Sequence, residues 1–158
     1  MSEIFDYTSF LDQSTETASE RRPPVPALEY LATITDVGMK PWQSKDKYNE
    51  DGTLKSGVML EVTTELQLPQ EVQDMCKIPK LTLLDRPMLD LLPDRSGIDY
   101  GLGKNGRLRM YREATGLNVA GQPFSPRMLV GRLIKIRVTH EEYQGNLQER
   151  VGGIAKAQ

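Results

Sequence analysis

One stretch of the chain, Gly57 to Leu68, alternates in side-chain character for twelve residues. Successive side chains of a β-strand point to opposite faces of a sheet, whereas a helix repeats about every 3.6 residues. The pattern therefore predicts a strand with one buried face, which ends at Pro69 because proline cannot donate a ladder hydrogen bond. The predicted buried face holds Val58, Leu60, Val62, Leu66 and Leu68, and the other face holds Met59, Glu61, Thr63, Glu65 and Gln67.

Weaker patterns elsewhere predict four further strands and one helix. The helix is expected to begin at Asn105 as its N-cap, to run to Thr115 and to end at Gly116. Residues 38–56 are expected to form a polar loop, and residues 70–79 to be irregular or weakly helical. The predicted strands span 28–37, 57–68, 80–84, 132–139 and 147–154.

This order predicts a mainly β fold: an OB-fold-like five-stranded Greek-key barrel with one helix between strands three and four. The predicted domain covers residues 27–158. Residues 1–26 are expected to form a flexible acidic N-terminal arm, because the first 20 residues hold five acids and no base and prolines then follow. A plain disordered tail is the alternative to an arm that docks on a partner. The candidate docking residues are Phe5, Tyr7, Phe10 and Leu11.

Positive charge is concentrated in one part of the chain. Eight Lys or Arg residues and a single acid, Glu113, lie between Lys104 and Arg137, whereas the whole chain has a formal net charge of −2. Such segregation is typical of a surface that meets a polyanion, because each neutralised phosphate releases condensed counterions. The alternative is a solvated helix face followed by an exposed strand face.

Motifs for catalysis and for cofactor binding are incomplete. Gly101, Gly103 and Gly106 have the spacing of a dinucleotide-binding loop, but no clear strand precedes them and no parallel βαβ unit surrounds them. The single cysteine, Cys76, and the single histidine, His140, provide neither a zinc ligand set nor a nucleophile–base pair. We therefore expect a protein that is not an enzyme and uses no cofactor or metal.

Nine residues are the predicted nucleic-acid contacts. Barrels of the OB type bind single strands on the face of strands two and three and with the loops that join strands one to two and four to five. Both segments combine aromatic rings, which stack on bases, with cations, which follow the phosphate backbone. Trp42 could instead cap the end of the barrel. The predicted contacts are Trp42, Lys45, Lys47, Tyr48 and Lys55 in the first segment and Lys135, Arg137, Tyr143 and Arg150 in the second.

Three stretches resemble a known family. The segments PALEYLATITDV, GRLRMYREATGL and LVGRLIKIRVTHEEYQGNLQERVGGI are similar to the small single-stranded-DNA-binding proteins that bacteriophages and prophages encode. The resemblance covers most of residues 26–155. It implies an OB-fold and binding of single-stranded DNA, largely without sequence preference, during phage DNA replication or recombination. The positions that match are Tyr30, Ala32, Ile34, Gly116, Gly131 and Gly145.

The chain departs from that family at two places. The loop expected over residues 38–56 is long, and the C-terminal GGIAKAQ lacks the acidic tail with which many single-strand binders recruit partners. Replication or recombination proteins are therefore expected to meet the acidic N-terminal arm, if they meet the chain at all. Self-association into a homo-oligomer is left open.

The remaining expectations concern location and the competing function. The lone cysteine suits a reducing compartment, and the sequence shows neither a secretory signal nor an apolar run of membrane-spanning length. We expect a cytoplasmic protein without membrane association, in the host cytoplasm if a phage encodes it. The alternative function is that of a small β-barrel virion-structural or protein-interaction module with no nucleic-acid role.

Overall fold

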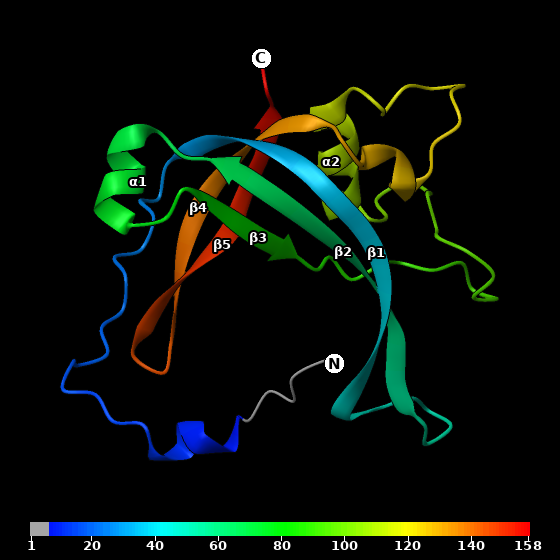
Figure 1. Cartoon of the computed structure of the whole chain (residues 1–158). Coiled ribbons are helices and arrows are strands. Elements are labelled where there is room, and N and C mark those ends of the chain that lie inside the picture. Colours follow the sequence, from blue (N-terminus) through cyan, green and yellow to red (C-terminus); the bar gives the residue numbers. More distant parts are fainter. Residues whose placement is uncertain (1–6) are drawn as a thin grey trace, which may run out of the picture.

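The computed structural model describes residues 7–158, which are mainly β-structure (Figure 1). Five strands form one open antiparallel sheet in the order β3-β2-β1-β4-β5, and short helices pack beside it. Phe5 lies outside the described residues. The strands are β1 (Glu29–Tyr48), β2 (Leu54–Gln67), β3 (Lys80–Asp85), β4 (Leu133–Tyr143) and β5 (Asn146–Lys156), the α-helices are α1 (Gln70–Cys76) and α2 (Gly106–Thr115), and the 3-10 helices are Thr8–Asp12 and Pro126–Leu129.

The core lies on the inner face of the curved sheet and follows the predicted alternation. On β4, Ile134, Ile136 and Val138 are fully buried, while the residues between them face outward. On β2 the buried face includes Thr64, whose hydroxyl donates to the Leu83 carbonyl of β3 at 3.3 Å, so the one polar group of this row has a partner. The described helices are short, the longest having 10 residues, and none of them could span a bilayer.

Helix α2 connects the two edge strands of the sheet. The Arg107 Nε donates to the Asp85 carboxylate at the end of β3 at 3.0 Å, and one terminal nitrogen donates to the Val151 carbonyl of β5 at 2.8 Å. Tyr111 is fully buried and its hydroxyl donates to the same carboxylate at 2.6 Å. Burial and the neighbouring Asp85 raise the pKa of Tyr111 far above its ordinary value, so this donor keeps its proton.

The prediction of one helix, between strands three and four, needs correction. Helix α1 lies between β2 and β3, where only weak helicity was expected, and α2 follows β3. The α1 sequence is seven residues long and polar, so propensity alone gives a weak signal. Its stability comes from the packing of Val72 and Cys76, which are four residues apart and both buried in the core.

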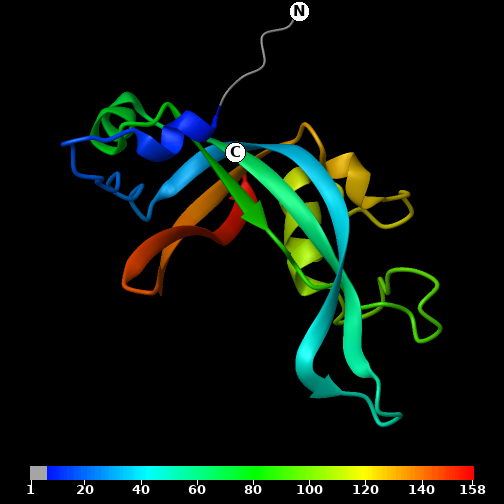
Figure 2. The same ribbon diagram turned by 60° about the horizontal axis from the view of Figure 1, so that its bottom comes forward.

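The loop expected over residues 38–56 is largely strand. β1 and β2 continue beyond the core as a two-stranded ribbon that pairs Gln43 with Ser56 and closes through the turn at Asn49–Thr53 (Figure 2). The prediction failed because residues of this ribbon are polar on both faces, so apolar alternation is missing there. The turn at Gly52, with φ of +86°, has the left-handed conformation that glycine tolerates.

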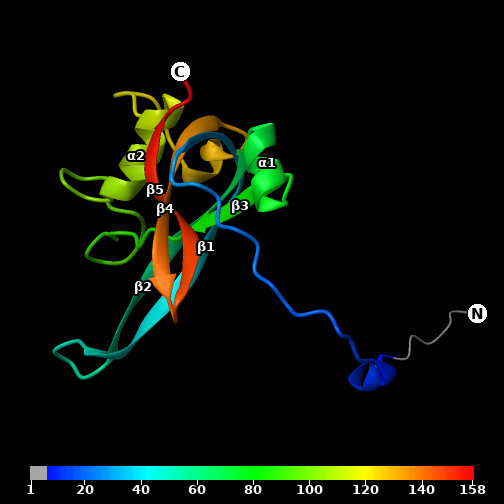
Figure 3. The same ribbon diagram turned by 90° about the vertical axis from the view of Figure 1, so that its left-hand side faces the viewer.

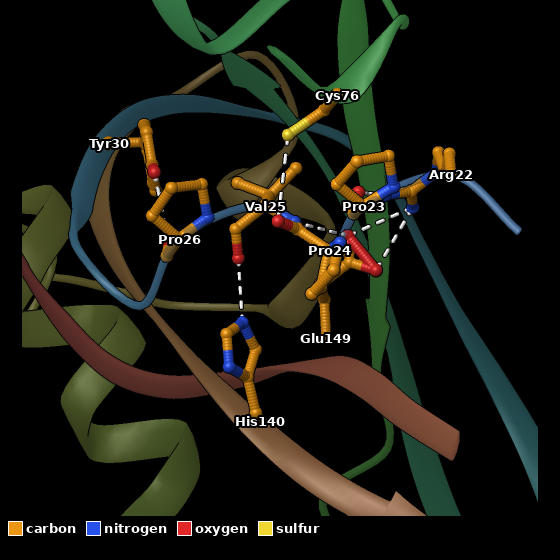
Figure 4. Close-up of polar contacts among 9 residues, drawn as sticks. All are labelled: Arg22, Pro23, Pro24, Val25, Pro26, Tyr30, Cys76, His140 and Glu149. Atoms are coloured by element: carbon orange, nitrogen blue, oxygen red, sulfur yellow. Dashed lines mark hydrogen bonds and ion pairs between the residues drawn. The ribbon is translucent and has the colours of Figure 1, made fainter.

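The arm expected over residues 1–26 is attached to the sheet through its last five residues (Figure 4). Val25 is fully buried, its N–H donates to Glu149 at 3.4 Å and its carbonyl lies 2.7 Å from the His140 Nε2. Arg22 contacts both oxygens of the Glu149 carboxylate, at 3.0 and 2.9 Å. Figure 3 shows residues 7–21 running outward from the sheet. The packed domain therefore begins at about residue 22, before the boundary expected at residue 27.

Replacing Arg107 tests the link between the edge strands. We expect Arg107→Ala to lower the free energy of unfolding by about 1–3 kcal/mol, because it removes hydrogen bonds to Asp85 and to β5. Arg109→Ala is the matched control on the same helix. Among residues 7–158 the Arg109 side chain pairs only with the exposed Glu113, at 3.7 Å, so its loss should cost less than about 0.5 kcal/mol. Urea denaturation measures both, and equal losses would contradict the role of Arg107.

Replacing Glu149 tests the attachment of residues 22–26. Glu149→Ala should speed tryptic cleavage between Arg21 and Arg22 by roughly tenfold, because a charged hydrogen-bonding partner of about 1.5 kcal/mol or more is lost. Glu141→Ala on the same hairpin is the control, since its pair with Arg150 is exposed. Similar cleavage rates in the two variants would show that Glu149 does not hold the segment.

Candidate functional site

The nine predicted contact residues lie on two separate hairpins. Five are on the β1–β2 ribbon and four are on the hairpin of β4 and β5, and both hairpins extend from the lower part of the molecule in Figure 1. We call the outward face of β4 and β5 that carries Lys135, Arg137, Tyr143 and Arg150 the hairpin surface. We call the outward face of the ribbon around Trp42 the ribbon surface. Within the described residues no hydrogen bond or ion pair joins the two surfaces.

The hairpin surface is one continuous row along the sheet. Lys135, Arg137 and Tyr143 occupy odd positions of β4, opposite in direction to its buried even positions. Arg150 of β5 pairs with Thr139 of β4, so its side chain points to this same face. Residues two apart on a strand are separated by about 6.8 Å, and the row from 135 to 143 is therefore about 27 Å long.

The cations of this row differ in whether a neighbouring side chain already binds them. Arg150 donates to the Glu141 carboxylate at 3.0 Å and to Gln148 at 2.8 Å. Neither Lys135 nor Arg137 forms an ion pair with any described acid. Their neighbours across β5 are Ala155 and Gly153, whose small side chains leave the two cations uncovered on that side. On the β1 side Lys135 faces Leu31, whereas Arg137 faces the exposed Glu29 without an ion pair between them. Lys135 and Arg137 are thus the two cations of the row without an ion pair, and Lys135 has no acid opposite it.

The row ends at an exposed aromatic ring. Tyr143 is 59% exposed and precedes the turn formed by Gln144 and Gly145, both with positive φ. This turn presents the ring beyond the end of the packed sheet. The nearest charged residues on this face are Glu141 and Arg150, which pair with each other, and the free cations Lys135 and Arg137 lie at the other end of the row. The ring provides a stacking surface at one end of the row, and these cations provide charge for a backbone at the other.

The ribbon surface is organised by the only tryptophan of the chain. Trp42 of β1 pairs with Gly57 of β2, and the indole lies over the glycine, where a Cβ would come within 2.7 Å of the indole Nε1. The ring is half-buried and its Nε1 has no hydrogen-bond partner. Trp42 thus packs on the ribbon itself, through Gly57. The core cluster of the described residues does not include it, so its position differs from that of a residue that caps the barrel end.

Sequence reasoning missed two cations of the ribbon surface. Lys40 is exposed and pairs with Met59, so it stands on the same face as Trp42, two residues away. Extending the period-two pattern of Tyr30, Ala32 and Ile34 would have placed Lys40 on the buried face, because the irregularity between Ile34 and Asp36 reverses the alternation. Arg95 arrives from a distant loop and both terminal nitrogens lie 3.5 Å from the Ser56 carbonyl. No sequence signal places Arg95 there, because the contact depends on the tertiary fold.

The end of the ribbon holds the other four predicted contacts of that segment. They are exposed, but three acids lie among them, so the local charge of residues 44–55 is zero. One of these acids is structural: Asp51 accepts hydrogen bonds from the Thr53 hydroxyl and N–H, which lower the pKa of its carboxyl. Residues 135–150 of the other hairpin also hold three cations and three acids, so net charge along the chain does not distinguish the two hairpins as sites for a polyanion. The four residues are Lys45, Lys47, Tyr48 and Lys55.

One well-formed cleft contains none of the nine predicted contacts. It has a volume of about 610 Å³ and lies between β3 and the β4–β5 hairpin. The attached N-terminal segment forms one wall through Arg22 and Pro24, and the opposite face of the hairpin forms another through Leu147 and Glu149. The predicted contacts of the two hairpins thus do not meet at this cleft.

The basic stretch from Lys104 to Arg137 is also divided by the fold. Arg107 is engaged by Asp85, whereas Lys135 and Arg137 belong to the hairpin surface. Lys104 and Arg112 instead line a pocket beside α2. The basic stretch therefore contributes to three different places: the ion pair with Asp85, the hairpin surface and the pocket beside α2.

Adding a methyl group at Gly57 tests the packing of Trp42. Gly57→Ala should displace the indole, destabilise the ribbon by roughly 1–3 kcal/mol and shift the tryptophan emission to longer wavelength, because a Cβ has no room. Gly38→Ala is the matched control on β1, where a Cβ meets nothing within 4 Å. Fluorescence and denaturation of both variants provide the check. Unchanged emission in Gly57→Ala would contradict the packing described.

Comparison with known proteins adds no relative. No protein-family model matches the chain, and no curated protein matches its sequence.

Proposed function

We propose that this chain is a non-enzymatic single-stranded-DNA-binding protein that holds the strand along the hairpin surface. The observation that carries the proposal is the row of Lys135, Arg137 and Arg150 on one face of β4 and β5, which ends at the exposed ring of Tyr143. Cations in line can follow a phosphate backbone, and a ring at the end of their row can stack on a base of any identity. Such a protein would coat exposed strands during phage DNA replication or recombination.

The topology supports an OB-fold as part of this proposal. The sheet order β3-β2-β1-β4-β5 leaves β3 and β5 as the edges, and a five-stranded Greek-key barrel closes at those strands. Arg107 connects these two edges through Asp85 and Val151, and α2 lies between β3 and β4 in the chain. The β1–β2 ribbon and the β4–β5 hairpin correspond to the two loops with which OB-folds contact oligonucleotides.

The ribbon surface adds a second place for contact. Trp42 presents a ring that its glycine partner holds in position, and Lys40 stands beside it on the same face. A ring fixed before binding loses little conformational freedom when a base stacks on it. A strand long enough to reach both hairpins would therefore gain two stacking sites.

The salt dependence of binding tests the role of the free cations. Affinity for a labelled poly-dT oligonucleotide should fall steeply with salt, and the double variant Lys135→Gln/Arg137→Gln should reduce the log–log slope by about 1.4, since each phosphate contact contributes about 0.7. Lys156→Gln, at the end of β5 remote from the hairpin turn, is the control and should retain the slope. If the protein does not bind the labelled poly-dT oligonucleotide at low salt, the proposal is wrong. Equal affinity for heparin and DNA would favour the protein-interaction alternative.

Exchanging the Tyr143 ring tests stacking separately from charge. Tyr143→Ala should weaken poly-dT binding by about 1–3 kcal/mol, the value of one stacked base. Tyr143→Phe keeps the ring and should bind almost as well as the unmodified chain. Fluorescence anisotropy titrations measure both variants. If Phe and Ala weaken binding equally, the ring does not stack on a base.

A further inference from the structure

A second basic pocket lies beside helix α2, apart from both hairpins. It has a volume of about 360 Å³ and is formed by residues 100–105, the first turns of α2 and Asn118. Three of its lining residues are cations, and none is an acid. The cations are Lys104, Arg109 and Arg112.

Aromatic rings hold Arg112 in place. Its guanidinium carbon lies 4.3 Å from the centre of the Phe124 ring and 5.6 Å from that of Tyr100. The two rings are 6.2 Å apart and nearly perpendicular, at 88°. Contacts of this kind fix the orientation of a guanidinium without neutralising its charge. Arg112 is therefore positioned by neutral groups.

Arg112 has no anionic partner, unlike the arginines with structural roles. Arg22, Arg86 and Arg107 each have a carboxylate oxygen at 2.9 or 3.0 Å. The Arg112 Nε is buried and has no hydrogen-bond acceptor among the described residues. A buried N–H without an acceptor is costly, so the arrangement is one that an incoming hydrogen-bond acceptor such as an anion would stabilise.

The acids nearest in sequence do not line the pocket, and each has a partner, which for Glu113 is the pocket residue Arg109. Glu113 faces Arg109 at 3.7 Å, on the exposed side of the helix. The Asp99 carboxylate accepts the N–H of Gly101 at 2.8 Å. The Asp90 carboxylate accepts the backbone N–H of Asn105, also at 2.8 Å. No carboxylate therefore fills the pocket from within.

The loop that carries Lys104 is held rigidly. Asn105 is only 6% exposed and has a positive φ of 51°. Its side-chain oxygen accepts the Asp90 N–H at 2.8 Å, and its side-chain nitrogen donates to the Asp90 and Asp99 carbonyls at 3.0 and 2.7 Å. Asn105, the predicted N-cap, thus connects the backbone at Asp90 and Asp99 through its side chain. These hydrogen bonds fix the wall of the pocket before any ligand binds.

We propose that this pocket binds a phosphate group, with Arg112 as the principal contact and Lys104 and Arg109 as supporting charges. The planar fork of a guanidinium matches the oxygens of a phosphate, and Tyr100, 46% exposed, offers a ring beside it. The GxGxxG spacing does not indicate a dinucleotide site, because the described strand pairs are all antiparallel. The pocket is independent of the hairpin surface, so this inference does not rest on the proposed function.

Titration of the full chain with inorganic phosphate tests the site. At constant ionic strength, held with sodium chloride, the Arg112 Nε–Hε resonance should shift saturably. Arg112→Gln should weaken phosphate binding by about tenfold or more, the value of a charged hydrogen bond. Arg127→Gln, an exposed arginine outside the pocket, is the matched control and should bind normally. Lys104→Gln, on the exposed loop, should weaken binding severalfold and provides a second variant if Arg112→Gln does not fold.

Two arms of the experiment separate the sources of the phosphate. If poly-dT competes with phosphate and Arg112→Gln lowers affinity for poly-dT, the pocket takes a backbone phosphodiester. The ligand is a free phosphate or a nucleotide if phosphate binds saturably and Arg112→Gln leaves the affinity for poly-dT unchanged. The same conclusion holds if phosphate binds saturably and the unmodified chain does not bind poly-dT. Shifts that are linear in phosphate, or that are equal in the Arg127→Gln and Arg112→Gln variants, would overturn the site.

Discussion

The shared carboxylate of Asp85 is the contact on which the arrangement of this protein depends. It accepts hydrogen bonds from Arg107 and Tyr111 of α2, while Arg107 also reaches the Val151 carbonyl of β5. Without this contact the two edges of the sheet would have no polar connection through the helix. The largely buried position of the pair strengthens it, because water competes little for these donors. The curvature that brings β4 and β5 back toward β3 is thereby stabilised from one end.

Fixing the sheet at that end leaves two hairpins to project from it. A two-stranded ribbon is only marginally stable alone. Here Trp42 covers Gly57 and supplies packing that the core does not provide. The free edge of β1 carries Pro41 and Lys40, residues that discourage pairing with another strand. The free edge of the ribbon is thus protected against pairing with another strand.

The sequence predicted the parts of the fold that depend on local pattern. All five strands and α2 lie where alternation and capping signals placed them, because burial on one face imposes a period on the residues. It did not predict the ribbon, whose two polar faces have no such period, nor α1, which is stabilised by packing of Val72 and Cys76. The attachment of Val25 was missed for a related reason: prolines around it signal an extended chain but not its contact with Glu149.

The candidate site was harder to predict than the fold. Alternation on β4 correctly placed Lys135 and Arg137 outward, and the register with β5 adds Arg150 to their face. The sequence could not show that Arg107 forms a structural ion pair with Asp85. Nor could it show that rings from two loops pack against Arg112, because both contacts depend on tertiary neighbours. Charge counted along a chain therefore overstates the charge that any one surface presents.

Ultraviolet cross-linking of the full chain to a poly-dT oligonucleotide, with the linked peptides identified by mass spectrometry, tests the central claim most directly. Binding along the hairpin surface predicts that the peptide containing Tyr143 is linked, and that the link is lost in Tyr143→Ala. A cross-link confined to peptides outside both hairpins, or none at oligonucleotide concentrations that saturate the protein, would contradict it.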